Sequence, residues 1–304
     1  MPSFVTTATL HVPVLLVIFN RPSTTKLVFE AIRLARPPRL YIAADGPRPE
    51  VERDVFNCAQ AREIVNHVDW DCEVKTLFRE KNLNCGIAPS SAFTWFFEHE
   101  EEGIILEDDC LPSQSFFLYC QELLERYRDD TRVMHIGGNN FLNGWEKDKD
   151  YSYYFSRSGH IWGWATWRRA WKHFDFGISL YQQLKREDYF ASFFMNWPEK
   201  VYRMRKFEKT VDKRRKVDWW DYQWDFARYT NSGLAIVPKV NLVKNLGFGE
   251  MATHTKNDNT YSARLEGADI ELPLKHPPFM MRDLEADRRY FKNFLRDVVL
   301  SKLK

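Results

Sequence analysis

The sequence predicts an α/β protein in which helices flank a mostly parallel central sheet. Short, continuous apolar runs such as residues 14–19 and 40–44 have the composition of strands that are buried on both faces, as parallel strands are. Amphipathic helical patterns alternate with these runs through the first half of the chain, as in βαβ units. The chain has 304 residues, of which 44% are hydrophobic, and this is enough for one large domain with its own core.

The predicted elements follow in a regular order up to about residue 137. Asn20-Arg21-Pro22 ends the first strand, and Ser23 or Thr24 can cap a helix that extends to about residue 34. The next predicted elements are a strand at 40–44, a helix at 55–65, a strand at 73–78, a helix at 89–100, a strand at 103–106, a helix at 112–128 and a strand at 132–136.

The second half of the chain, from about residue 150, is irregular, aromatic and basic. We expect only a strand at 234–238 and a closing helix at 283–302, where charged and apolar residues alternate at helical spacing. Aromatic residues make up 15% of the chain, and their clustering between Tyr151 and Trp224 predicts a ring-lined cleft on which a sugar could stack. No linker separates the halves, so we expect a single domain over residues 1–304.

Charge and cysteine content narrow the class of protein. The net charge of +2 gives no field that would favour a nucleic acid partner. The five cysteines include no C-x-x-C pair, which predicts reduced, mostly buried thiols. The apolar run at 12–19 is too short to span a bilayer. We therefore expect a cytoplasmic protein, either soluble or peripheral at the inner face of the plasma membrane.

Glu107-Asp108-Asp109 follows the apolar run at 103–106 and is the most informative motif. Carboxylates repel one another and resist burial, so packing gives no reason to end a strand in three of them. Mg²⁺ and Mn²⁺ prefer oxygen ligands and take only one or two from protein carboxylates. A solvated acidic turn is the alternative. The position at the carboxyl end of a strand, where open α/β sheets bind ligands, favours a metal-diphosphate site.

Polar residues also follow the first two predicted strands. Asp45 could accept hydrogen bonds from a ribose or a base, or it could be the turn residue of Asp45-Gly46. Arg21 could contact a diphosphate or a base, or lie at the surface as an ordinary arginine. The chain has no G-x-G-x-x-G and no Walker A loop, which counts against a dinucleotide oxidoreductase and a P-loop enzyme. A metal would then have to neutralise the phosphates.

Two aromatic motifs lie in the second half. In the segment 158–167, Gly163 permits close approach of a ligand and Trp164 offers a stacking face, but core packing is an equal alternative. In the segment 218–225, Asp218, Asp221 and Asp225 recur at helical spacing. An acid beside apolar rings loses hydration, which raises its pKa and makes it a better base. The polar face of an amphipathic helix is the alternative, and for Asp225 it is the favoured one.

Two further features have competing interpretations. Nine Lys or Arg residues lie between Lys200 and Lys216, as on a solvated helix face; an anionic membrane surface or a lipid-diphosphate acceptor would also suit them. His254 follows Gly247-Phe248-Gly249 between two threonines. It is a candidate ligand for metal or diphosphate, and a structural histidine is the alternative.

Taken together, these motifs resemble the GT-A glycosyltransferases, in particular the N-acetylglucosaminyltransferase I-like group and its bacterial relatives. The resemblance extends from about residue 13 to 254. Glu107-Asp108-Asp109, followed by Pro112 and Phe116-Phe117, resembles the E-D-D variant of the family's D-x-D motif. The resemblance implies a GT-A (Rossmann-like) fold with a nucleotide-sugar-binding half at about 1–150, an aromatic acceptor-binding and catalytic half at about 151–260, and a C-terminal extension at 261–304.

The resemblance also implies an activity: metal-dependent, inverting transfer of a sugar from a nucleotide-diphosphate donor to a hydroxyl of a glycan or a lipid-linked acceptor, in bacterial cell-surface polysaccharide synthesis. A UDP-sugar is the favoured donor. Asp109 would bind Mn²⁺ or Mg²⁺, with His254 as a further candidate. The implied donor-binding residues are Asn20, Arg21, Asp45, Glu107, Asp108, Gly163 and Trp164.

Trp220-Asp221 is similar to the family's segment that carries the catalytic base. The family has paired acids after the tryptophan, whereas this chain has Asp221-Tyr222, so Asp218 and Asp225 are alternates to Asp221. Two other functions compete with glycosyl transfer. A sugar nucleotidyltransferase would use similar acids, but it normally has a glycine-rich N-terminal loop that this chain lacks. A non-catalytic module that binds a nucleotide sugar or a glycan is the other.

Overall fold

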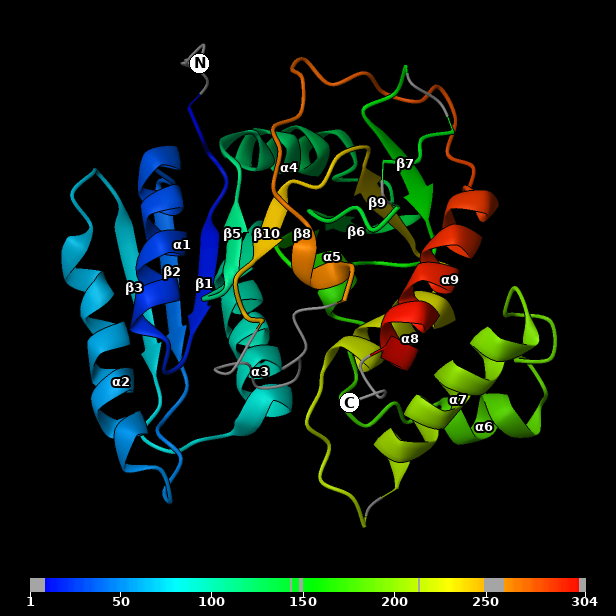
Figure 1. Cartoon of the computed structure of the whole chain (residues 1–304), viewed down its shortest axis with the longest axis horizontal. Coiled ribbons are helices and arrows are strands. Elements are labelled where there is room, and N and C mark those ends of the chain that lie inside the picture. Colours follow the sequence, from blue (N-terminus) through cyan, green and yellow to red (C-terminus); the bar gives the residue numbers. More distant parts are fainter. Residues whose placement is uncertain (1–8, 143, 148–149, 213, 249–259, 301–304) are drawn as a thin grey trace.

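The computed structural model describes residues 9–142, 144–147, 150–212, 214–248 and 260–300 (Figure 1). The first half contains β1 (Val14–Ile18), α1 (Pro22–Ala35), β2 (Arg39–Ala44), α2 (Glu52–Arg62), the 3₁₀ turn η1 (Glu63–His67), β3 (Glu73–Phe78), α3 (Asn84–His99), β4 (Glu102–Glu107), β5 (Cys110–Pro112), α4 (Gln114–Arg126) and β6 (Val133–Gly137). The second half contains β7 (Tyr153–Ser156), β8 (Trp164–Trp167), α5 (Arg168–Trp171), α6 (Tyr181–Arg186), α7 (Trp197–Val211), α8 (Asp221–Thr230), β9 (Leu234–Pro238), β10 (Val243–Asn245), η2 (Ser262–Arg264) and α9 (Leu284–Leu300).

An eight-stranded sheet in the order β3-β2-β1-β4-β8-β6-β9-β7 forms the centre of the molecule. Strands β3, β2, β1 and β4 are parallel neighbours, so their carboxyl ends lie at one edge. Strand β8 runs antiparallel to both β4 and β6. The β6–β9 pair is parallel and the β9–β7 pair is antiparallel. Strands β5 and β10 form a separate antiparallel pair. The predicted fold class, a mostly parallel sheet flanked by helices with a closing helix, is confirmed.

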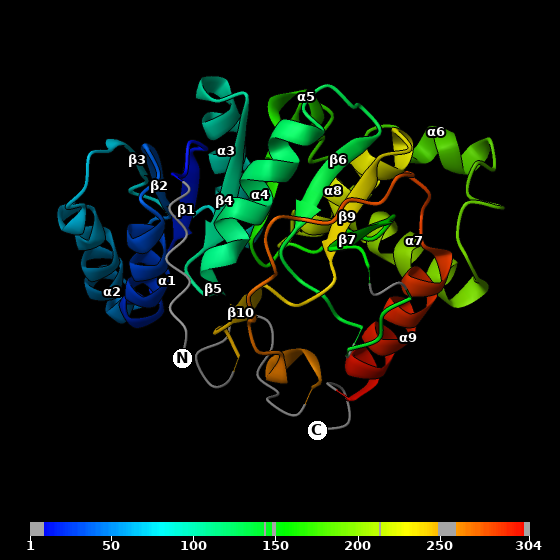
Figure 2. The ribbon, with the colours of Figure 1, turned by 90° about the horizontal axis from the view of Figure 1, so that it is seen from above.

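Helices cover both faces of the sheet, because alternate residues of its strands point to opposite sides. Leu16 of β1 packs in a core that includes Phe29 of α1 and Phe116 of α4. Leu15, its neighbour in β1, packs in a second core with Phe93 of α3 and with tryptophans of the second half. A third, aromatic cluster joins helices α6, α7 and α8. Figures 1 and 2 show α1 and α2 at one end of the molecule and α6, α7 and α9 at the other.

Several boundaries differ from the predicted ones. Helix α3 begins at Asn84 rather than near residue 89, with Pro89 inside it. Helix α8 begins only at Asp221, so the prediction that Asp218, Asp221 and Asp225 share one helix face is wrong for Asp218. Strands β5, β7, β8 and β10 were not predicted, because runs of three or four residues carry no readable alternation.

Two expectations about the whole chain can be compared with the structure. The five cysteines are free thiols, and Cys58, Cys110 and Cys120 are buried, as expected. Within the residues that the structure describes, no helix has both the length and the apolar character needed to cross a bilayer.

Candidate functional site

A cleft of about 1090 Å³ lies between the carboxyl ends of β1, β2 and β4 and the helices α7, α8 and α9. Residues from both halves of the chain line it. They include most of the predicted site residues, namely Asn20, Arg21, Asp45, Glu107, Asp108, Asp109, Asp218, Asp221 and Asp225. Gly163 and Trp164 are not among the lining residues. Strands of the first half and helix α8 of the second half therefore bring most of the predicted donor residues and the predicted base into one cavity.

Arg21 bridges two of the three acids at the end of β4. It precedes Pro22, the first residue of α1, and its carbonyl accepts hydrogen bonds from Thr25 N and Oγ1 at 3.0 and 2.8 Å. Its guanidinium donates to Asp109 Oδ2 at 2.7 Å and to Asp108 Oδ1. Burial alone would lower the pKa of Arg21, but the two carboxylates raise it above its ordinary value. Arg21 is therefore a permanent cation at the centre of the site.

Asp108 and Glu107 differ in how they are held. Asp108 is buried, and its Oδ2 accepts a hydrogen bond from Phe19 N at 3.0 Å in addition to the Arg21 contact. No hydrogen bond reaches the Glu107 carboxylate from any residue that the structure describes. Burial, followed by the charges of Asp109 and Asp108, raises the pKa of Glu107 above its ordinary value. Glu107 thus lines the cleft with hydrogen-bonding capacity to offer a ligand.

The segment after β10 closes over Asp109. Leu246 N donates to the Asp109 carbonyl oxygen at 2.7 Å. At Gly247, a Cβ atom would lie 2.1 Å from Asp109 Oδ2 and 3.0 Å from Arg21 Nη1. A side chain at position 247 would therefore displace the carboxylate or the guanidinium. The glycine lets the backbone approach this ion pair closely.

The acids at the end of β4 are the candidate ligands for a divalent cation. Asp108 and Asp109 share the single guanidinium of Arg21, and Glu107 lies beside them, so negative charge is in excess at this end of the strand. Within the described residues, no group of three or more His, Cys, Asp or Glu side chains is placed so that it could hold a metal ion by itself. Mg²⁺ and Mn²⁺ do not need such a group, since one or two carboxylates are enough when water and substrate phosphates complete the shell. His254, the other candidate ligand, lies outside the described residues.

Asp45 and Asn20 hold loops at the rim of the cleft. The Asp45 carboxylate accepts hydrogen bonds from Gly46 N, Leu83 N and Asn82 Nδ2, each at 2.9 Å. These contacts agree with the interpretation of Asp45 as the turn residue of Asp45-Gly46. Burial raises the pKa of its carboxyl group. Asn20 Nδ2 donates to Asp54 Oδ1 at 2.6 Å.

Asp54, the partner of Asn20, was not picked out in the sequence, although it too lines the cleft. It is buried and also accepts hydrogen bonds from Arg48 Nε at 2.6 Å and Nη2 at 3.0 Å. Burial opposes its ionisation, but these hydrogen bonds from Arg48 and Asn20 keep its pKa below the ordinary value. Asp54 therefore fixes two polar side chains along the rim that Arg21 and Asp45 share.

Asp221 is the first residue of α8 and lies across the cleft from β4. Burial, and secondarily the charge of Asp225, raises the pKa of Asp221 to about 6. Lys206 and Arg203 act in the opposite direction and keep the shift moderate. Asp221 is also close enough to Glu107 to contribute to that residue's raised pKa. The Asp221 carboxylate is thus more basic than that of an ordinary aspartate.

Asp225, an alternate base, is committed to an ion network. It accepts from Arg203 of α7 through one oxygen and from Arg228 of its own helix through the other. Both carboxylate oxygens therefore carry guanidinium partners, which leaves neither to take a proton from a substrate. Asp218 lines the cleft ahead of α8 and keeps its place as an alternate.

Trp164 is a core residue, contrary to its predicted contact with a donor. Its side chain is fully buried and stacks on Trp220 at 5.5 Å and on His135 at 5.2 Å. Gly163 has φ +64°, and a Cβ there would lie 2.8 Å from Val243, so a turn and tight packing explain this glycine. Trp162, two residues earlier than Trp164, is the tryptophan of this motif that lines the cleft.

The basic run between Lys200 and Lys216 is divided between two environments. Arg203 and Lys206 line the cleft, and the Lys206 ammonium lies 4.5 Å from the Tyr222 ring centroid and 4.8 Å from that of Trp219. The exposed members of the run are Arg205, Lys209, Arg214, Arg215 and Lys216. A uniformly solvated face is therefore wrong for α7, while membrane contact through the exposed members stays a prediction.

Comparisons with known proteins give little further information. No protein-family model matches the chain, and no curated protein matches it either. Among solved structures, HddC from Yersinia pseudotuberculosis is similar over 52% of this chain and 77% of its own, with 9% identity and a TM-score of 0.31. The inositol-1-phosphate CTP transferase of T. maritima matches over 54% and 73%, with 10% identity and a TM-score of 0.32.

A third solved structure, a UDP-glucose pyrophosphorylase in complex with UDP-glucose, is similar over 44% of this chain and 64% of its own. It has 11% identity and a TM-score of 0.26. At TM-scores this low, the residues of the cleft themselves must carry any functional conclusion.

Proposed function

We propose that this protein is a metal-dependent glycosyltransferase that moves a sugar from a nucleotide-diphosphate donor to an acceptor hydroxyl. One observation carries the proposal: Glu107, Asp108 and Asp109 at the end of β4 lie in the same cleft as Asp221 at the start of α8. A cation-binding carboxylate group opposite a carboxylate of raised pKa is what group transfer from a diphosphate needs.

The donor would bind along the carboxyl ends of β1, β2 and β4. Asp109, with part of its carboxylate turned toward Arg21, would hold Mg²⁺ or Mn²⁺ together with the donor diphosphate. The cation, when bound, supplies positive charge that stabilises the leaving diphosphate. Glu107 would accept hydrogen bonds from hydroxyls of the ribose or the sugar. Arg21 would orient the carboxylates and hold them together before the donor arrives.

Asp221 would act as general base. Its carboxylate would take the proton of the acceptor hydroxyl as that oxygen forms a bond to the anomeric carbon and the bond to the diphosphate breaks. Attack on the face opposite the leaving group gives inversion. A base of pKa near 6 is largely ionised at neutral pH, yet it is more basic than an ordinary aspartate. Such help is worth roughly 10²–10⁴ in rate.

A donor-hydrolysis screen tests this function. The purified protein is incubated with UDP-, GDP-, dTDP- and CMP-sugars, with Mn²⁺, with Mg²⁺ or with a chelator, and release of the nucleotide is measured. We expect hydrolysis of one nucleotide class that requires metal. Asp109→Asn should abolish it, whereas the matched control Asp71→Asn, at an exposed aspartate outside the cleft, should not.

The same screen separates the competing functions. Pyrophosphate release from a nucleoside triphosphate and a sugar 1-phosphate would assign the protein to the nucleotidyltransferases. Metal-linked binding of a nucleotide sugar without turnover on any acceptor would assign it to the non-catalytic modules. Hydrolysis that is unchanged in Asp109→Asn would show that the metal site has been assigned to the wrong residue.

A further inference from the structure

A continuous series of aromatic rings lines the cleft on the side of α7, α8 and α9. Successive ring centroids lie 5.0–6.3 Å apart. In order of contact the rings are Trp219, Tyr222, Tyr202, Phe294, Tyr290, Phe141, Trp162 and Phe248; we call them the ring wall. All eight line the cleft and all are partly exposed, so their faces or edges are available to a ligand.

Both ends of the ring wall lie beside the candidate reacting groups. Phe248 follows Gly247, which touches the Asp109–Arg21 ion pair. At the other end, Trp219 and Tyr222 flank Asp221 in sequence and line the same cavity. A ligand that lies on the ring wall would therefore have one of its groups next to Asp221.

The C-terminal helix supplies the middle of the ring wall. Tyr290 and Phe294 are four residues apart on α9, so they share one helix face. Asn293 and Asp297 belong to the same side of the helix and also line the cleft. The resemblance noted in the sequence ends before this helix, and no role was expected for it beyond closing the fold.

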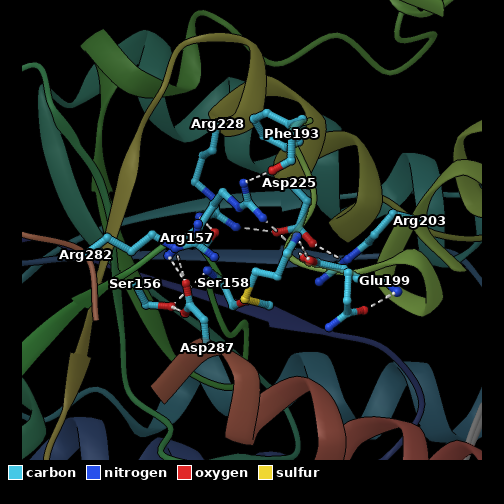
Figure 3. Close-up of polar contacts among 12 residues, drawn as sticks. Ser156, Arg157, Ser158, Phe193, Glu199, Arg203, Asp225, Arg228, Arg282 and Asp287 are labelled. Carbon is cyan, nitrogen blue, oxygen red and sulfur yellow. Dashed lines mark hydrogen bonds and ion pairs between the residues drawn. The ribbon is translucent and has the colours of Figure 1, made fainter. Parts of the chain in front are cut away.

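Buried ion pairs fix α9 and α7 in place (Figure 3). Asp287 of α9 accepts hydrogen bonds from Ser156 Oγ, Arg157 N and Arg282 Nε, and Asp283 N donates to the carbonyl oxygen of Phe155 in β7 at 2.7 Å. The same close-up shows the Arg203–Asp225–Arg228 bridge between α7 and α8. The four rings on these helices, Tyr202, Tyr222, Tyr290 and Phe294, are therefore held in place, and a binding surface that is rigid beforehand loses less entropy on binding.

The chemistry of the ring wall favours an uncharged, hydroxyl-rich ligand. Tyr202 and Tyr222 place their hydroxyl groups 2.6 Å apart at its edge. His160 is neutral, because burial lowers its pKa to about 3, and its ring contacts both Phe141 and Tyr290. Of the two cations beside the wall, Arg203 is paired with Asp225, and Lys206 lies over the Trp219 and Tyr222 rings, close enough to Asp221 to lower its pKa. Flat apolar faces with polar edges match the faces and hydroxyl rims of pyranose rings.

We propose that the ring wall binds an uncharged oligosaccharide acceptor of several sugar units, and that α9 is part of this acceptor site. The series of rings is longer than one sugar ring can cover, so a single monosaccharide would leave most of it unused. This inference rests on the proposed glycosyl transfer, since it is Asp221 that would receive the acceptor hydroxyl at the end of the wall.

The test is binding of uncharged oligosaccharides to the full-length protein by calorimetry. The probes are gluco-, galacto-, manno- and chito-oligosaccharides, from single sugars to hexasaccharides. We expect affinity for one series to rise with chain length. Phe294→Ala should weaken binding of the longer members by roughly tenfold while the single sugar is little affected. Phe294→Tyr, which keeps the ring, should bind as the parent does. So should Phe279→Ala, at an exposed ring outside the cleft.

Three results would overturn this inference. They are absence of binding by every series, equal affinities for the parent and Phe294→Ala, and displacement of the bound oligosaccharide by farnesyl phosphate, which would assign the wall to a lipid chain. Donor hydrolysis without acceptor separates the two proposals. If the parent hydrolyses no donor, the proposed function fails; if hydrolysis is normal but no oligosaccharide binds, only the acceptor assignment fails.

Discussion

Gly247 and Asp109 are in such close contact that a Cβ atom on the glycine would lie 2.1 Å from the carboxylate oxygen Oδ2. Beside this contact, the Leu246 N–H is bonded to the Asp109 carbonyl oxygen and the Asp109 carboxylate is bonded to Arg21. The contact joins the segment after β10 to the end of β4. The placement of Asp109 therefore depends on Gly247, which lies well over a hundred positions later in the chain.

Gly247→Ala should reduce donor hydrolysis by about 10² or more while the protein stays folded, because displacement of a catalytic group by an ångström is costly. The measurement is the rate of nucleotide release with saturating Mn²⁺, beside circular dichroism of the fold. Gly177→Ala is the matched control, since a Cβ there meets nothing closer than 3.5 Å. A fully active Gly247→Ala protein would show that Asp109 can move freely.

Arg21→Met should lower the thermal stability of the protein and make that stability depend on a bound divalent cation. The change leaves Asp108 and Asp109 without their shared cation, and loss of one partner of a buried ion pair costs about 3–5 kcal/mol. A divalent cation at the same carboxylates would restore the missing charge. Thermal melting with and without Mn²⁺ measures both effects. The metal-induced rise in Tm should be larger for Arg21→Met than for the parent protein, and an equal or smaller rise would contradict the metal assignment.

Asp221→Asn should leave donor binding intact and lower the rate of transfer by at least about 10². Calorimetry measures binding of the donor, and a transfer assay measures the rate of sugar transfer. The variant should be no less stable than the parent at pH 7.5, because the raised pKa means that the ionised carboxylate is disfavoured in the folded state. Asp218→Asn is the companion variant. If it, and not Asp221→Asn, abolishes transfer, the base is misassigned.

The pH dependence of kcat/KM should show an acid limb with a midpoint near pH 6. Asp221 acts only when ionised, so activity is full above its pKa of about 6 and falls tenfold per unit below it. Lys206 lowers this pKa, so Lys206→Met should move the midpoint to higher pH. Lys209→Met, at an exposed position of the same helix, should leave the midpoint in place. An unmoved midpoint in Lys206→Met would point to another group.

Asp225→Ala should be far more destabilising than the same change at Asp212, an aspartate whose arginine partners are exposed. Its loss leaves the buried Arg203 and Arg228 without a counter-charge, at a cost of about 3–5 kcal/mol. Asp212 also has two arginine partners, Arg214 and Arg215, but both are exposed to solvent that screens the charges, so Asp212→Ala should cost much less. Urea unfolding gives both free energies, and similar values would show that the network contributes little to stability.

The strands of the parallel half were predictable because burial on both faces produces apolar runs that are visible in sequence. Residues 14–19 and 40–44 were recognised on that basis, and they correspond to β1 and β2. Strand β8 was not recognised, since it consists of Trp164-Ala165-Thr166-Trp167, and two tryptophans near glycines also suggest a ligand site. What identifies it is its pairing with β4 and β6, which no local pattern contains.

The acids at the end of β4 were predictable, because packing gives no reason for three carboxylates to follow a buried apolar strand. The ion pairs of Asp225 were not predictable, because its partner Arg203 belongs to another helix. Gly247 gave no local signal, since its importance comes from a tertiary contact. The cleft-lining face of α9 did leave a signal, because Tyr290, Asn293, Phe294 and Asp297 recur at helical spacing in the sequence.

The ring wall has a consequence for the order in which the site is made during synthesis. Strands β1 to β4 and the three acids that follow β4 are complete once residue 109 has left the ribosome, and the parallel strand pairs can form from that segment alone. The Gly247 segment, which closes over Asp109, and then Tyr290 and Phe294 of α9 emerge much later. A nascent chain would thus contain the acids of β4 well before it contained the residues that fix Asp109 or the rings of α9, so both sides of the cleft are completed only late in translation.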